Sequence, residues 1–198
     1  MIKLVNREDY KRFKGLTSSS SDAQIDQLVI SISSLVKTYC GTTFRDYYDT
    51  DKTEYYTIHN TSTSELFLDE SPVVSITSLK ERTSQASPYV ELTTGAYEYN
   101  LESALSIITR TNDVVSKAFP KGFNSVEVIY KSGYQYTPKD LELAIYDLIT
   151  YYLKEEHKKD RAIVNTTISN TGTTSVKNDT GFPDHIRRVL DLYKVNSV

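Results

Sequence analysis

The sequence of 198 residues is poor in the residues on which common catalytic and metal sites depend. Cys40 is its only cysteine, which excludes an intrachain disulfide and a zinc site made of cysteines. The three histidines, His59, His157 and His185, lie far apart and form no HExxH or Cys-His pattern. The seven glycines form no GxxxxGK[ST], GxGxxG or GxSxG loop. We therefore expect no catalytic residues, no metal site and no cofactor.

The sequence also has no large excess of charge of one sign and no long apolar runs. Lys and Arg number 23 against 26 for Asp and Glu, and a net charge of -3 argues against a protein that coats nucleic acid or a membrane surface. No run approaches the ~20 apolar residues of a membrane span, and the first ten residues lack the apolar core of a signal peptide. We expect a protein that stays in the cytosol or is assembled from there, without a membrane partner.

The acidic residues are concentrated in one segment. Residues 46–70 contain seven acidic side chains and one basic side chain, Lys52, whereas residues 1–45 carry a net charge of +3. The spacing of Asp46, Asp49 and Asp51 does not match an EF-hand, and the turn glycine of that motif is missing. A solvated loop is the simplest interpretation. A hydrolase that uses two carboxylates of this segment is an alternative, although no spacing recommends it.

Apolar residues recur at helical spacing in two long segments. From Ile25 to Tyr39 they define one stripe, with Asp22 as the expected N-cap and Gly41 as the expected end. A second stripe follows Pro138 and continues to Leu153. Shorter helices are predicted at residues 6–16 and 183–194. Since neither long helix can bury its stripe alone, the two should pack on each other.

Between these helices the apolar period changes toward two. Val, Thr, Tyr and Ile dominate this region, which is typical of short antiparallel strands in a small sheet or barrel. Strands are predicted near residues 54–59, 65–68, 73–82, 89–92, 97–100, 105–109 and 125–131. The predicted fold is a single α+β domain, with a helical scaffold at residues 1–45 and 138–198 and an antiparallel β insertion at residues 46–137.

Tyrosine is in clear excess, with 16 residues. It forms doublets at residues 47–48, 55–56 and 151–152. A doublet in a strand sends its rings to opposite faces, so one ring of each pair must be covered by something else, such as a neighbouring subunit. The alternative is a monomeric β-rich module that binds a carbohydrate or protein through exposed tyrosines.

Several segments, taken in order, carry a family resemblance. They are residues 39–44 (YCGTTF), 66–79 (LFLDESPVVSITSL), 126–134 (VEVIYKSGY), 138–144 (PKDLELA) and 183–193 (PDHIRRVLDLY). Their order and spacing resemble the head-tail connector (adaptor) proteins of tailed bacteriophages, over about residues 22–194. The resemblance places Cys40 in the core at the end of the first long helix.

The resemblance implies a virion structural protein without an active site. Such a connector forms a ring of twelve copies under the portal protein, extends the DNA channel and docks the next neck or tail protein. Genome DNA then passes through the ring without sequence-specific binding. The expected location is the virion neck, after assembly in the host cytoplasm.

Three sets of residues are expected to meet partners. The C-terminal helix and tail should contact the portal or a neighbour through Arg187, Arg188, Tyr193, Val195 and Val198. The polar loop at residues 162–181 should be ordered by a neighbour or the next neck protein, to which Val164, Ile168 and Val176 could add a strand. Lining of the DNA channel by Asp46, Asp49 and Asp51 is an alternative to their role as solvated loop residues.

Overall fold

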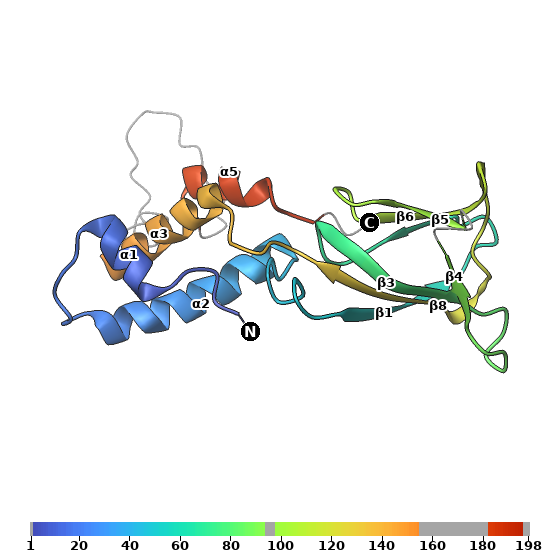
Figure 1. Cartoon of the computed structure of the whole chain (residues 1–198). Coiled ribbons are helices and arrows are strands. Elements are labelled where there is room, and N and C mark those ends of the chain that lie inside the picture. The colour runs from blue at the N-terminus through green and yellow to red at the C-terminus, as the bar shows by residue number, and fades with distance from the viewer. Residues whose placement is uncertain (1, 94–97, 155–181, 196–198) are drawn as a thin grey trace, which may run out of the picture. The chain divides into compact units, whose positions relative to one another are not determined.

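The computed structural model describes residues 2–93, 98–154 and 182–195. These residues form two compact units (Figure 1). The helical unit contains the described residues of 3–40 and 137–194, and the β unit contains those of 41–136 together with Ile2 and Val195. Helices and antiparallel strands are both present, so the predicted α+β class is confirmed.

The described part of the helical unit contains helices α1 (Arg7–Lys14), α2 (Asp22–Cys40), α3 (Lys139–Leu153) and α5 (Asp184–Asp191). At the start of α1, the Asn6 side chain accepts a hydrogen bond from the Asp9 N–H at 2.8 Å. Gly15 ends the helix in the left-handed conformation. Gly41, with a φ of +71°, follows the last residue of α2, as predicted.

The core of the helical unit forms where α2, α3 and α5 pack together. Its buried side chains lie at helical spacing, because each helix turns one face toward the others: Ile25, Val29, Ile32 and Val36 from α2, Leu141, Ile145, Leu148 and Ile149 from α3, and Ile186 and Leu190 from α5. The Thr137 hydroxyl donates to the Leu4 carbonyl at 2.5 Å, and the Leu4 N–H donates to the Ser33 hydroxyl at 3.2 Å. These bonds hold the N-terminal segment in the helical unit.

Asp22 is not the cap of α2 that the sequence predicted. It is the first residue of the helix, because the Ile25 N–H donates to the carbonyl of Ser21, one residue earlier. The Asp22 carboxylate instead accepts a hydrogen bond from the Lys11 ammonium at 2.7 Å, and so ties α1 to α2. The Asp22 side chain, which local spacing assigned to a helix cap, thus forms a tertiary ion pair with Lys11.

The β unit contains eight described strands in two antiparallel sheets. Four strands form the first sheet, in the order β1-β8-β3-β4, and the second has the order β2-β6-β5, with β7 paired to β6. The bounds are β1 Lys52–Ile58, β2 Glu65–Phe67, β3 Val73–Glu81, β4 Val90–Leu92, β5 Tyr99–Glu102, β6 Ile107–Asn112, β7 Val115–Ser116 and β8 Gly122–Ser132. Each predicted strand has a counterpart, but the expectation of one small sheet or barrel is wrong, since the strands divide between two sheets. The sequence also missed β7, which has only two residues.

One apolar core lies between the two sheets of the β unit. Val126, Val128 and Tyr130 alternate along β8 and are all fully buried. Ile58, Leu79 and Ile108 reach the same cluster from β1, β3 and β6. A single set of inward-facing residues therefore joins both sheets.

The tyrosine doublet of β1 divides between the two faces of its sheet, as the period of a strand predicts. Tyr56 packs against the core, whereas Tyr55 is 54% exposed. The doublet at residues 47–48 lies outside the strands, so the alternation argument does not apply to it.

Gly133 is the position where the β unit tolerates no side chain. It follows β8 with a φ of +94°, and a Cβ on it would lie 2.2 Å from the Phe44 carbonyl oxygen. The Tyr134 N–H donates to that carbonyl at 2.6 Å, so the approach of the two backbones is fixed by a hydrogen bond. Glycine is required here by both conformation and space.

We predict that Gly133→Ala lowers the free energy of unfolding by about 3 kcal/mol or more, because it adds a backbone clash to the strain of a positive φ. Gly41→Ala is the matched control in the same unit, with a φ of +71° and its nearest non-local contact at 3.8 Å. It should cost only about 1–2 kcal/mol, the conformational strain alone. Urea denaturation followed by circular dichroism measures both, and equal losses would show that the close approach is not limiting.

Candidate functional site

The described residues contain no group of three or more His, Cys, Asp or Glu side chains that could hold a metal ion. His59 and His185 are exposed, and His157 lies outside the described residues. Cys40 is buried, and its thiol lies 3.5 Å from the Leu190 carbonyl. Burial raises the pKa of Cys40 to about 12, so it remains a thiol at neutral pH. Within the described part of the chain, no helix has the length and apolarity needed to cross a membrane.

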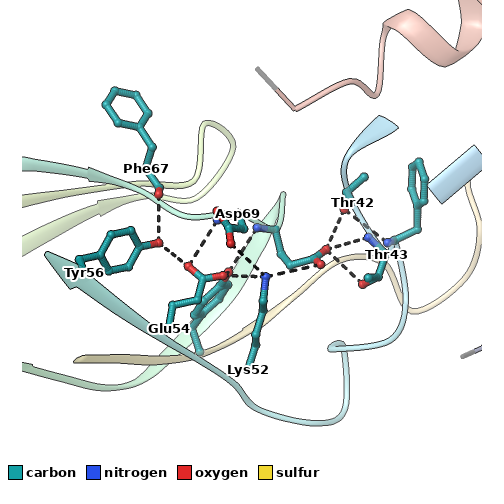
Figure 2. Close-up of polar contacts among 10 residues, drawn as sticks. Thr42, Thr43, Lys52, Glu54, Tyr56, Phe67 and Asp69 are labelled. Carbon is teal, nitrogen blue, oxygen red and sulfur yellow. Dashed lines mark hydrogen bonds and ion pairs between the residues drawn. The ribbon is translucent and has the colours of Figure 1, made fainter. Parts of the chain in front are cut away.

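The most densely bonded polar group of the β unit is a buried cluster around two carboxylates, here called the Glu54 cluster (Figure 2). It consists of Lys52, Glu54, Tyr56, Glu70 and Tyr130. The Glu54 carboxylate lies 2.7 Å from the Lys52 ammonium and accepts a hydrogen bond from the Tyr130 hydroxyl at 2.6 Å. The Tyr56 hydroxyl also contacts it and lies 3.0 Å from the Phe67 carbonyl. Strands β1 and β8 bring these side chains together, because alternate residues of each strand point inward.

Glu70 binds the chain that follows α2. One of its carboxylate oxygens accepts hydrogen bonds from the Thr42 hydroxyl at 2.9 Å and from the N–H and hydroxyl of Thr43 at 2.8 and 3.1 Å. The other oxygen lies 3.7 Å from the Lys52 ammonium. The Glu70 N–H donates to the Tyr130 hydroxyl at 3.2 Å. Glu70 thus joins the segment after α2 to the cluster.

Glu54 and Lys52 keep their ordinary ionised forms in the cluster. Burial raises the pKa of Glu54, but the hydrogen bonds from the lysine and the two tyrosines outweigh it, so the pKa lies below its ordinary value of 4.5. Burial lowers the pKa of Lys52, but the bond and attraction to Glu54 outweigh it and leave the pKa raised. Burial and the bond to Glu54 raise the pKa of both Tyr56 and Tyr130, which therefore remain donors.

The geometry of the Glu54 cluster indicates a structural role, in which its bonds stabilise the fold. A hydrolytic carboxylate pair needs one group that can take up a proton and open space for a water. Here Glu54 is 9% exposed and Glu70 is 5% exposed, and both are occupied by donors from the chain itself. The cluster does not favour the hydrolase alternative.

A groove opens beside the Glu54 cluster, within the β unit. Its volume is about 620 Å³, and it is lined by Gly41, Lys52, residues 56–58, Thr63, residues 65–70 and Val195. Strand β1 forms one wall and β2 with the residues after it forms the other. Lys52 and three carboxylates, Glu65, Asp69 and Glu70, give the lining a net charge of -2. The sequence did not reveal this groove, although the acidic segment at residues 46–70 supplies most of its lining.

The three aspartates predicted for a channel have different environments. The Asp46 carboxylate accepts a hydrogen bond from the Ile2 N–H at 3.0 Å, and that of Asp51 accepts one from the Thr77 hydroxyl at 2.7 Å. Asp49 is exposed. Asp46 and Asp51 therefore help to position their own loops, which the sequence did not predict.

The predicted partner residues of the C-terminal segment lie in two places. Arg187, Arg188 and Tyr193 belong to α5 and the turn after it, and Val195 lines the groove. The Tyr193 hydroxyl donates to the Asp140 carboxylate at 2.6 Å, which fixes the end of this segment to α3. Val198, Val164, Ile168 and Val176 lie outside the described residues.

We predict that Glu54→Gln lowers the free energy of unfolding by about 3 kcal/mol at pH 7, because it leaves the half-buried Lys52 without its nearest counter-charge. The folded-state pKa of Glu54 is lowered, so its carboxylate stabilises the fold above pH 4.5, and this contribution is lost as the pH falls through the lowered value. The difference between variant and wild type should therefore shrink toward zero below pH 4. Urea denaturation between pH 3 and 7 measures it. Glu65→Gln, at an exposed carboxylate, is the control and should change stability by less than about 0.5 kcal/mol.

Comparison with known proteins finds similarity to a phage head completion protein and to chains of two particle necks. The chain is 22% identical to the "Head completion protein" of Escherichia phage T5 over 193 residues, covering 98% of this chain and 99% of that protein. Its fold is similar to a chain of the "Neck of empty GTA particle computed with C6 symmetry", with a TM-score of 0.58, 12% identity and coverage of 98% and 91%. A chain of the "Neck of native GTA particle computed with C12 symmetry" matches with a TM-score of 0.53, 14% identity and coverage of 92% and 94%.

The predicted resemblance to the head-tail connector (adaptor) proteins of tailed bacteriophages is thereby confirmed. The family described as "HCP: Head completion protein" matches residues 3–195, which is nearly the whole chain. This chain belongs to the head completion protein family.

Proposed function

We propose that this protein is a non-enzymatic structural component of the virion neck, an adaptor between the portal protein and the next neck or tail protein. The observation that carries the proposal is the family match over residues 3–195. It agrees with the Glu54 cluster, whose carboxylates hold the fold together and do not face a substrate. Membership in a structural family supports the expectation that the chain is not an enzyme.

The proposed assembly is a ring of twelve copies that extends the DNA channel. Two of the similar chains come from necks reconstructed with six-fold and twelve-fold symmetry, which supports a ring with a multiple of six copies. A closed ring uses two different surfaces of each subunit, and exposed apolar side chains in both units are available for them. Tyr55 and Phe123 are two of these in the β unit, and Leu192 is one in the helical unit.

Within this ring we propose specific roles for the predicted contact residues. The single connector domain of residues 1–198 would use its helical scaffold, residues 1–45 and 138–198, to contact neighbours and the portal through Arg187, Arg188 and the tail. The loop at residues 162–181, with Val164, Ile168 and Val176, would meet a neighbour or the next neck protein. Asp49 would face the channel, where twelve copies of a negative charge repel phosphate and let DNA slide.

Electron microscopy of virions that contain this protein tests the ring. We predict twelve copies at the neck, in contact with the portal, with Asp49 directed toward the channel. A different copy number would correct the stoichiometry alone. A single copy, or none at the neck, would contradict the adaptor proposal and favour the alternative of a monomeric binding module.

Deleting residues 196–198 should weaken attachment to the portal by about tenfold and leave the melting temperature unchanged. The deletion spares Val195, which lines the groove of the β unit. Binding of the full-length and shortened proteins to purified portal rings measures the effect. Replacing residues 196–198 by three glycines is the control for length, and unaltered affinity of the deletion would remove the tail from the proposed contact.

A further inference from the structure

The two strands that form the walls of the groove are outer strands of their sheets. Among the described residues, β1 pairs with β8 alone and β2 pairs with β6 alone. Figure 1 shows β1 at the border of its sheet. On the side of an outer strand that has no neighbouring strand, backbone N–H and C=O groups can pair with another chain. In the β unit, both of these outer strands contribute residues to the lining of one groove.

The groove has the volume of an ordinary ligand pocket, with apolar surface in its lining and an acidic rim. Its volume of about 620 Å³ lies within the range of roughly 300–1,000 Å³ found for ligand pockets. Ile58, Leu66 and Leu68 supply apolar surface at the lining, while the exposed Glu65 and Asp69 make its rim acidic. A strand added here would gain main-chain hydrogen bonds from the edge and contacts for alternate side chains.

We propose that residues 162–168 of a neighbouring copy occupy this groove as an added strand along the edge of β1 or β2. Their sequence, Ala-Ile-Val-Asn-Thr-Thr-Ile, contains five β-branched residues in seven, the composition that favours strands. Its length equals the seven residues of β1. The inference rests on the proposed ring, because it names the surface that receives the contact loop of the next subunit.

Charge complementarity supports this occupant. Residues 158–161, directly before the segment, are Lys-Lys-Asp-Arg, with a net charge of +2. The groove lining has a net charge of -2, from Lys52, Glu65, Asp69 and Glu70. A basic flank beside an acidic rim fixes the direction of an inserted strand and disfavours acidic competitors.

The chain is long enough for such an exchange. Seven residues separate Lys154, at the end of α3, from residue 162, and they span about 23 Å when extended. Thirteen residues return from residue 168 to Phe182, which allows about 43 Å. These lengths give the segment reach on both sides for pairing with another copy.

Disulfide trapping with pairs of single-cysteine variants tests the proposal. One protein carries Phe67→Cys, at an exposed groove residue of β2, and the other carries Asn165→Cys or Thr166→Cys. Both segment positions are used because adjacent residues of a strand point to opposite sides. Cys40 is buried and stays in all variants, and wild-type protein reports its background. Equal mixtures are oxidised mildly, and disulfide-linked dimers are quantified on non-reducing gels.

We expect Phe67→Cys to give at least fivefold more mixed dimer than Val90→Cys with one of the two segment variants. Val90 is the matched control, an exposed apolar residue on β4, at the opposite border of the first sheet. Equal yields would overturn the choice of groove. A double variant, Phe67→Cys with Thr166→Cys, that forms only intramolecular disulfide would overturn the neighbouring copy as the occupant.

A charge reversal separates this inference from the ring itself. Glu65→Lys, in the trapping background, should lower the dimer yield at least threefold, and Glu102→Lys should leave it unchanged. Both glutamates are exposed on outer strands of the same sheet, β2 and β5, but only Glu65 lines the groove. Absence of trapping in protein that still forms neck rings by electron microscopy would refute the strand exchange alone. Absence of the ring would refute the proposed function.

Discussion

The compensation of two buried carboxylates is the constraint on which the β unit depends. Glu54 and Glu70 are nearly inaccessible to solvent, and an isolated carboxylate would be neutralised in such a place. Lys52, Tyr130 and the residues after α2 supply the donors that keep them bound. Because these partners come from strands β1 and β8 and from the segments around residues 42 and 70, the same bonds determine where the chain enters and leaves the sheets. The cluster therefore fixes the positions of these strands and segments relative to one another within the β unit, which apolar packing alone would not specify.

In the part of the β unit that the structure describes, no further strand pairs with β1 or β2, both of which contribute to the groove. The chain between β1 and β2 contributes Thr63 to the groove, and β1 pairs with β8 alone among the described residues, so no described strand pairs with its outer edge. Natural proteins usually cover or shorten such edges, since they promote association. In the proposed ring, each subunit must associate with its neighbours. An open edge is then useful, provided that charge and shape restrict which chain can pair with it.

Much of the fold followed from local pattern. The apolar stripes of α2 and α3, the left-handed glycines that follow α1 and α2, and the strands at residues 52–58 and 122–132 all lie close to their predicted positions, because period and turn chemistry are properties of neighbouring residues. The division of strands between two sheets could not be read in this way. It depends on pairing between residues far apart in sequence, such as Glu54 with Val128 and Leu66 with Ile108. The role of Asp22 was also wrongly predicted, since its partner Lys11 reaches it only in the folded helical unit.

The sequence by itself determined the fold class, the lack of local catalytic motifs and the family resemblance, since composition, period and the order of motifs are written along the chain. The tertiary structure decided what the acidic segment at residues 46–70 does. As a sequence it is a segment with seven carboxylates and one lysine, for which a solvated loop was the simplest interpretation and a channel lining or a hydrolytic site were alternatives. In the fold, Glu54 and Glu70 turn inward to Lys52 and the tyrosines, Asp51 binds Thr77, and Glu65 and Asp69 line a groove. The physical reason is that the energy of a carboxylate depends on its burial and on the donors around it, which come from strands and loops distant in sequence and are assembled only when the sheets form.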